Sequence, residues 1–258
     1  MRPRDFKSLV FTNFTTPAIC SQLIVNMHIA RFAFRANTVA MMDEKKISPP
    51  DFDTDFQEKL SSLLAWRRDV RRFRTDPLPE GAIEELIGLA SLAPSVGNSQ
   101  PWRFILVDDK DRRIAIRQNF ETANADALND YEGEQARLYA SLKLSGFDQA
   151  PVQMAVFVDL ATTVGHGLGK KTMPETLSYS VVGAINAMWL AARARGIGIG
   201  WVSVLNPDDV NATLEAPEGW KLVAYLCIGY PEEEHIDPEL ERHGWQHRLD
   251  TSGFILRR

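Results

Sequence analysis

The stretch Trp66-Arg67-Arg68-Asp69-Val70-Arg71-Arg72-Phe73 carries a single acidic residue inside a dense basic block. Five of the eight residues from 67 to 74 are arginines, although the formal net charge of the chain is −5. Guanidinium groups bind phosphate oxygens through paired, charge-assisted hydrogen bonds. Asp69, surrounded by these cations, is expected to stay ionised at neutral pH and to be available as a base or an acceptor. For an isolated arginine run, a solvated charged face at the end of a helix is the alternative.

A second motif follows about thirty residues downstream, with the sequence Ala93-Pro94-Ser95-Val96-Gly97-Asn98-Ser99-Gln100-Pro101-Trp102-Arg103-Phe104. It is a polar loop, interrupted by Gly and Pro, that leads directly into the apolar run 104–107. Such loops can present amide side chains and free backbone N–H groups to a ligand. Taken alone, the motif indicates no more than a turn.

Together, the two motifs resemble those of the FMN-binding nitroreductase family, and the resemblance covers roughly residues 55 to 250. In that family an Arg-Arg-Ser-x-Arg segment binds the flavin phosphate, and a Pro-Ser-x-x-Asn-x-Gln-Pro-Trp loop reaches the isoalloxazine ring. Here Asp69 stands in place of the serine, and Gly200-Trp201-Val202-Ser203-Val204-Leu205 follows later. Both features are similar to the branch that makes 5,6-dimethylbenzimidazole, the lower ligand of vitamin B12 (cobalamin), by destroying FMN. The resemblance implies an α+β fold, with a mixed sheet surrounded by helices, in an intertwined homodimer.

The resemblance also implies which residues form the site. Asp69 and Ser203 are the expected catalytic residues, as a base near the ribityl chain and as a hydrogen-bonding group in oxygen activation or proton transfer. The expected flavin contacts are Arg67, Arg68, Asp69, Arg71, Ser95, Asn98, Val204, Leu205 and Arg248. Structural roles remain open for both catalytic candidates, because Asp69 could cap a helix or pair with Arg72 and Ser203 could be a strand serine.

The resemblance implies reduced FMN as the substrate, together with O2. The source of the electrons stays open at this point, with NAD(P)H as a candidate indirect reductant and a flavin reductase as a candidate partner. Two other functions stay open. One is a conventional FMN-dependent NAD(P)H nitroreductase or oxidoreductase acting on small aromatic acceptors. The other is a non-catalytic flavin-binding protein.

The composition limits the class of protein. A chain of 258 residues, with 45% hydrophobic and 24% charged residues, suits one globular domain. Its pI of about 5.6 argues against a nucleic-acid binder. Its two cysteines form no disulfide framework, which favours a cytoplasmic location. Because no run of about 20 apolar residues is present, no membrane span is expected.

The first fifty residues differ from the rest. We expect residues 1–50 to be a poorly ordered N-terminal extension and residues 51–258 to be the flavin-binding domain. Met41 or Met42 is a candidate natural start, because the family resemblance begins only after them. A targeting peptide is the alternative, although polar residues interrupt every apolar run.

Hydrophobic periodicity and turn residues predict the order of the elements. The expected helices cover residues 53–66, 79–93, 109–147 with breaks near Gly133 and Gly146, 174–194, and a short helix after Asn206-Pro207. The expected strands cover residues 103–107, 152–159, 201–204 and 222–228. The helix at 174–194 is apolar nearly all round, which predicts burial in a core or in a subunit interface.

Two further motifs are set aside. The glycines from Gly196 to Gly200 follow a helix, whereas a dinucleotide-binding loop precedes one, so Gly196 is predicted to be a helix C-cap. His243 and His247 have the spacing of a helical metal pair, but Gly244 and Trp245 between them weaken a helix. No metal site is predicted.

Overall fold

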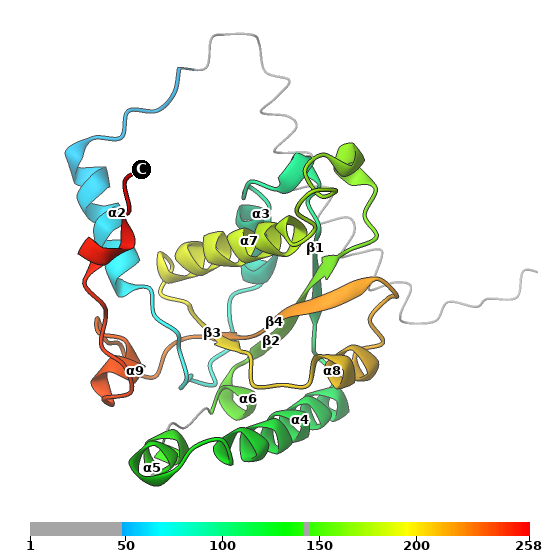
Figure 1. Cartoon of the computed structure of the whole chain (residues 1–258), viewed down its shortest axis with the longest axis vertical. Coiled ribbons are helices and arrows are strands. Elements are labelled where there is room, and N and C mark those ends of the chain that lie inside the picture. Colours follow the sequence, from blue (N-terminus) through cyan, green and yellow to red (C-terminus); the bar gives the residue numbers. More distant parts are fainter. Residues whose placement is uncertain (1–47, 142–144) are drawn as a thin grey trace, which may run out of the picture. The chain divides into compact units, whose positions relative to one another are not determined.

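A computed structural model of the protein describes residues 48–141 and 145–258. The predicted N-terminal extension and the candidate start at Met41 or Met42 lie almost wholly outside the described residues. Phe52 to Arg258 belong to one compact unit (Figure 1). Its helices are α2 (Thr54–Trp66), α3 (Ala82–Ala90), α4 (Lys110–Leu128), α5 (Gly133–Ser141), α6 (Gly146–Gln149), α7 (Thr176–Arg193), α8 (Pro207–Thr213) and α9 (Glu239–Arg242), with 3-10 turns η1 (Val96–Asn98), η2 (Val164–Gly167) and η3 (Thr251–Phe254).

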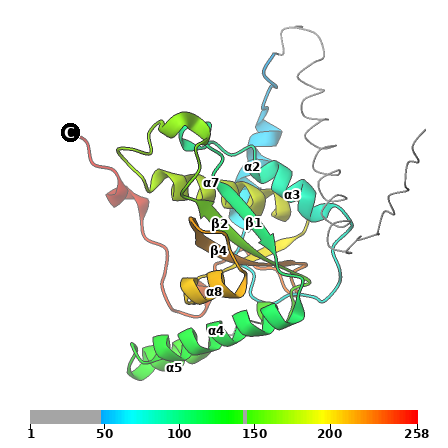
Figure 2. The ribbon, with the colours of Figure 1, turned by 90° about the vertical axis from the view of Figure 1, so that its right-hand side faces the viewer.

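Four strands form one sheet in the order β1-β2-β4-β3, and every neighbouring pair is antiparallel. They are β1 (Trp102–Leu106), β2 (Val152–Asp159), β3 (Gly198–Val202) and β4 (Trp220–Gly229). Helices lie on both faces of this sheet (Figures 1 and 2). The predicted α+β class is confirmed. Among the described residues, an isolated parallel bridge joins Asp69 to Ile199 of β3 at the edge of this sheet.

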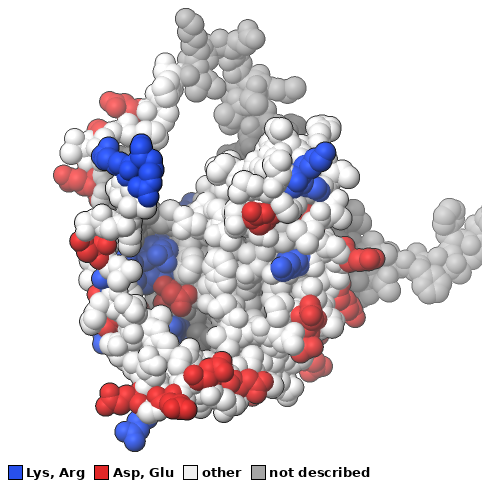
Figure 3. Space-filling view, in the orientation of Figure 1, with Lys and Arg blue, Asp and Glu red and all other residues white. Residues whose placement is uncertain are grey.

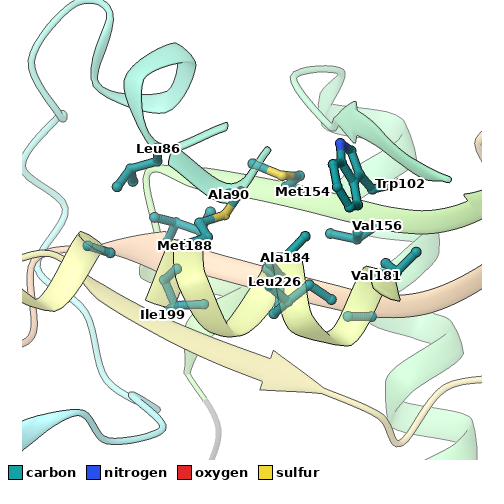
Figure 4. Close-up of a cluster of buried hydrophobic side chains, with 14 of the residues drawn as sticks. Leu86, Ala90, Trp102, Met154, Val156, Val181, Ala184, Met188, Ile199 and Leu226 are labelled. Carbon is teal, nitrogen blue, oxygen red and sulfur yellow. The ribbon is translucent and has the colours of Figure 1, made fainter. Parts of the chain in front are cut away.

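The central strand β2 is buried on both faces, as its continuous apolar run predicts. Its side chains alternate between two clusters, with Met154 and Val156 in one and Ala155 and Phe157 in the other. The first cluster packs under α3 and α7 (Figure 4), and the second faces α4, α6 and α8. The sheet is therefore the middle layer of the domain.

The long helix α7 uses one face for this core. Val181, Ala184 and Met188 are fully buried, whereas Tyr179 is 60% and Val182 is 42% exposed. One face of α7 is therefore buried in the core of its own chain, as predicted. The face that carries Tyr179 and Val182 stays exposed in the single chain. At its end, Gly196 has a φ of +70°, and Ile197 N–H donates to the Ala192 carbonyl at 3.0 Å. This geometry confirms the predicted glycine cap.

Residues 109–147 contain the three helices α4, α5 and α6, and the breaks predicted near Gly133 and Gly146 are confirmed, since α5 begins at Gly133 and α6 at Gly146. One predicted strand end differs from the structure. Strand β3 ends at Val202 rather than at Val204. Its last pair is Val202 with Tyr225, and just beyond Tyr225 the β2–β4 register shifts. The pairing of β3 with β4 therefore ends beside an irregularity in β4, and such irregularities change the local twist of a strand.

Candidate functional site

The basic block lies along the edge strand β3. Val70 N–H donates to the Ile199 carbonyl at 3.1 Å, and Arg74 N–H donates to the Tyr230 carbonyl at 2.9 Å. Between them, the Phe73 side chain is 1% exposed and packs into the second core cluster. One buried aromatic side chain and a few backbone hydrogen bonds therefore hold the arginines at the edge of the sheet.

The block sits so close to β3 that no side chain fits at position 200. A Cβ atom on Gly200 would lie 2.1 Å from the Val70 carbonyl oxygen, which is backbone and cannot rotate away. We therefore expect Gly200→Ala to lower the free energy of unfolding by about 1–3 kcal/mol, a typical cost of overpacking. Urea denaturation at fixed protein concentration measures this. Gly253→Ala is the control, because nothing lies within 4 Å of a Cβ there. Equal stability of the Gly200→Ala protein would contradict this packing.

Apart from Arg71, which lies 3.8 Å from Asp69, the structure divides the arginines near β3 into two groups. Arg72 pairs with Glu233 and also with Glu239, at 3.2 Å, and Arg74 pairs with Asp76 at 2.8 Å. These carboxylates neutralise both guanidinium groups. Neither Glu233 nor Glu239 was predicted from the sequence, since both lie far down the chain from the block and no local pattern connects them to it.

The second group consists of Arg67, Arg68 and Arg248, which form no ion pair with any described residue. The Arg67 guanidinium lies over the Trp189 ring at 4.8 Å, and Arg68 Nε donates to the Ile236 carbonyl at 2.7 Å. Partial burial, then the charges of Arg248 and Arg67, lower the pKa of Arg68. Figure 3 shows basic and acidic side chains in a recess near α2. Neighbouring cations without a carboxylate partner fit a phosphate group.

Asp69 is held at the end of this group. Its Oδ1 accepts a hydrogen bond from Trp201 N–H at 2.8 Å, and its Oδ2 lies 3.8 Å from Arg71 Nε. The structural alternative of a pair with Arg72 is wrong, because Arg72 is occupied by Glu233 and Glu239. The contact with Trp201 places the Asp69 carboxylate near the end of β3.

The pKa of Asp69 is set mainly by burial, and not, as expected, by the charges of the neighbouring arginines. Although 40% of the side chain is exposed in the single chain, protein atoms crowd the carboxylate. This desolvation raises its pKa to about 6, against the opposing effects of the Trp201 N–H group and Arg71. The group is still mainly ionised at pH 7, and it titrates close enough to neutrality to take up and release a proton.

The segment after β3 contains the other expected ring-side residues. Ser203 is exposed and directly follows the strand, while Val204 and Leu205 are half-buried. Leu205 packs against the second core cluster. Since Trp201 contacts Asp69, the structure brings this segment to the same end of β3 as the carboxylate.

Ser95 and Asn98 lie elsewhere in the single chain. Their loop is attached to the first half of α7, where Val96 N–H donates to Ser180 Oγ at 3.1 Å. The basic block contacts the second half of that helix, through Trp189. The two contacted residues are nine positions apart in the helix, or about 13 Å along the axis. The structure therefore does not bring these two residues to the arginines within one chain.

Two further features concern the histidines and the long helices within the part of the chain that the structure describes. No group of three or more His, Cys, Asp or Glu side chains is placed to hold a metal ion there. His243 lies 3.8 Å from Glu239, and His247 lies 3.7 Å from Glu241. None of the described helices is long and apolar enough to cross a membrane.

Comparison with known proteins identifies the family. The Nitroreductase family profile matches residues 64–230. The chain is 58% identical over 199 residues to a 5,6-dimethylbenzimidazole synthase of Rhodospirillum rubrum, covering 77% of this chain and 94% of that protein. It is 49% identical to the synthase of Rhodobacter capsulatus, covering 78% and 97%. An iodotyrosine deiodinase crystallised with FMN and 3-iodo-L-tyrosine has the same fold, with a TM-score of 0.61, 23% identity, and coverage of 77% and 97%. The chain therefore belongs to the nitroreductase family, within the branch of the 5,6-dimethylbenzimidazole synthases.

Proposed function

We propose that this protein is a 5,6-dimethylbenzimidazole synthase, an oxidoreductase that fragments reduced FMN with O2 to make the lower ligand of vitamin B12. High identity to two such synthases over most of their length supports this reaction. The structural observation that carries it is the Asp69 carboxylate, held by Trp201 N–H at 2.8 Å beside the basic group. A serine hydroxyl at that position is a much weaker base. Residues 51–258 form the proposed flavin-binding domain.

Each part of the proposed site has a distinct task. Arg67, Arg68 and Arg248 bind the flavin phosphate, with Arg71 beside the ribityl hydroxyl groups. Asp69 accepts a proton from the ribityl chain. The Ser203 hydroxyl forms a hydrogen bond at the edge of the flavin ring, and Val204 and Leu205 make apolar contacts there. Reduced FMN supplies the electrons that activate O2. It also supplies the carbon atoms of the product.

A second copy of the chain completes the proposed site. The loop of Ser95 and Asn98 contacts α7 at Ser180, and the arginines contact it at Trp189, about 13 Å further along the helix, so a partner subunit is the better source of these loop residues. The open apolar face of α7 and the apolar side chains of α2 support a homodimer, since Phe56 is 44%, Leu60 is 41% and Leu64 is 51% exposed in the single chain.

The source of electrons belongs to the same proposal. NAD(P)H acts as an indirect reductant, through a flavin reductase that supplies reduced FMN. A cytoplasmic location provides both the NAD(P)H and the flavin reductase. The buried, unpaired Cys227 is compatible with such a reducing compartment.

Mass spectrometry tests the proposed reaction directly. The purified protein is supplied with reduced FMN in air, and the products are followed over time. We expect loss of FMN with the appearance of 5,6-dimethylbenzimidazole. Intact, merely reoxidised FMN would contradict the synthase. Reduction of an added aromatic acceptor would then indicate a conventional NAD(P)H-dependent flavin oxidoreductase.

The pH dependence of this reaction follows from Asp69. Because its pKa is raised to about 6, the carboxylate is protonated, and unable to act as a base, below that pH. We expect product formation to fall as the pH decreases through about 6 and to be nearly constant from pH 7 to 8. Single-turnover yields at saturating reduced FMN measure this profile. A yield that is unchanged at pH 5 would contradict the role of Asp69 as the base.

A further inference from the structure

The loop between β3 and α8 carries the proposed ring-edge residues but has little hydrogen bonding of its own. Strand pairing ends at Val202. Within the described part of the chain, residues 203–205 form no backbone–backbone hydrogen bond, and the Ser203 hydroxyl has no protein partner. Apart from the partial burial of Val204 and Leu205, the loop is held by the contacts at its two ends.

One side chain from α4 holds the far end of this loop. Asn206 N–H donates to Asn119 Oδ1 at 2.8 Å, and Asn119 Nδ2 donates to the Asn206 carbonyl at 3.0 Å. A side-chain amide carries a donor and an acceptor in one plane, as a peptide group does, so it satisfies both backbone groups of Asn206. In Figures 1 and 2, α4 lies beside α8, and the loop from β3 enters α8 there. The Asn206 side chain is separately engaged as the N-cap of α8.

Helix α4 is a firm support for this contact. Ile116, one turn before Asn119, is fully buried in the second core cluster. Arg113 donates to the Val107 and Pro151 carbonyls, the second at 3.2 Å, which joins the helix to the ends of β1 and β2. Asn119 therefore connects the loop to the sheet through a fixed element rather than through another loop.

We propose that Asn119 is a positioning residue, which fixes residues 203–205 at the flavin ring through its paired hydrogen bonds to Asn206. This inference rests on the proposed function. Proton transfer requires heavy-atom distances of about 2.6–3.2 Å, and a misplacement of about 1 Å can cost 10²-fold in rate. Loss of the pair leaves the arginines of the proposed phosphate site untouched, so we expect a larger effect on chemistry than on flavin binding.

The test uses Asn119→Ala in the full-length protein. Alanine is the better helix former, so the variant does not weaken α4 itself. Without flavin, we expect hydrogen exchange at the Asn206 amide to become at least about 10-fold faster, because its acceptor is gone. With reduced FMN in air, we expect the yield of 5,6-dimethylbenzimidazole per flavin consumed to fall about 10-fold or more, the balance appearing as intact oxidised FMN. The dissociation constant for FMN should stay within about 3-fold of the wild-type value.

Two further variants sharpen the result. Gln118→Ala removes an exposed amide from the same helix and should match the wild-type protein in exchange and yield. Asn119→Asp keeps an acceptor for Asn206 N–H but loses the donor. Its hydrogen-exchange rate at Asn206 and its product yield should therefore lie between those of the wild type and Asn119→Ala. If Asn119→Ala does not fold, Asn119→Asp is used for the test in its place. Unchanged Asn206 exchange, or an unchanged yield beside faster exchange, would overturn the inference. Absence of product from the wild-type protein would instead overturn the proposed function.

Discussion

Asp69→Asn is expected to retain FMN and to lose formation of 5,6-dimethylbenzimidazole by a factor on the order of 10²–10⁴, the usual contribution of a general base. Asparagine has the same shape, and its Oδ1 can still accept the hydrogen bond that Trp201 N–H makes at 2.8 Å. The backbone contact between the basic block and β3 is therefore preserved. What disappears is the group whose pKa of about 6 lets it take up a proton near neutral pH.

Product formation in single turnovers with reduced FMN measures the effect, and a titration with oxidised FMN measures binding. Asp76→Asn is the matched control, since Asp76 also lies beside an arginine of the block, Arg74, but forms no hydrogen bond or ion pair with β3 among the described residues. It should make product at the wild-type rate. Turnover by Asp69→Asn within about 3-fold of the wild-type rate would show that another group removes the proton.

Local signals were sufficient for much of the fold. The apolar run at 152–159 gives β2 with the predicted bounds, because a strand buried on both faces needs no polar alternation. Asn206-Pro207 predicts the start of α8, where the Asn206 side chain accepts from Asp208 and Asp209 N–H groups. In each case the signal and the structure occupy the same few residues.

The rest depends on contacts between distant parts of the chain. Glu239 neutralises Arg72, and this ion pair distinguishes Arg72 from the arginines without an ion pair. The sequence around Arg72 contains no sign of Glu239, and the sequence around Glu239 contains no sign of Arg72. Likewise, the raised pKa of Asp69 comes mainly from burial created by folding, which overrides the local excess of arginines. The pair between Asn119 and Asn206 was not predicted for the same reason. Motifs indicated the residue types of the candidate site, and tertiary packing sets the partners of these residues and the direction of the pKa shift of Asp69.

Arg68→Met is expected to weaken FMN binding about 10- to 100-fold, the effect of losing a charge-assisted hydrogen bond worth about 1.5–3 kcal/mol. Arg68 has no ion pair with any described residue, and it lies close enough to Arg67 and Arg248 for their charges to lower its pKa. A bound phosphate would relieve this repulsion. Methionine keeps an unbranched apolar side chain at the position, so packing changes little.

Titrations with FMN and with riboflavin separate phosphate binding from ring binding. Because riboflavin lacks the phosphate, Arg68→Met should reduce the affinity for FMN and leave that for riboflavin nearly unchanged. The control is Arg74→Met, whose guanidinium is already paired with Asp76 at 2.8 Å and should not contribute. Equal losses for both flavins would mean that Arg68 supports the fold of the site. Unchanged FMN affinity would move the phosphate away from the cluster of Arg67, Arg68 and Arg248 altogether.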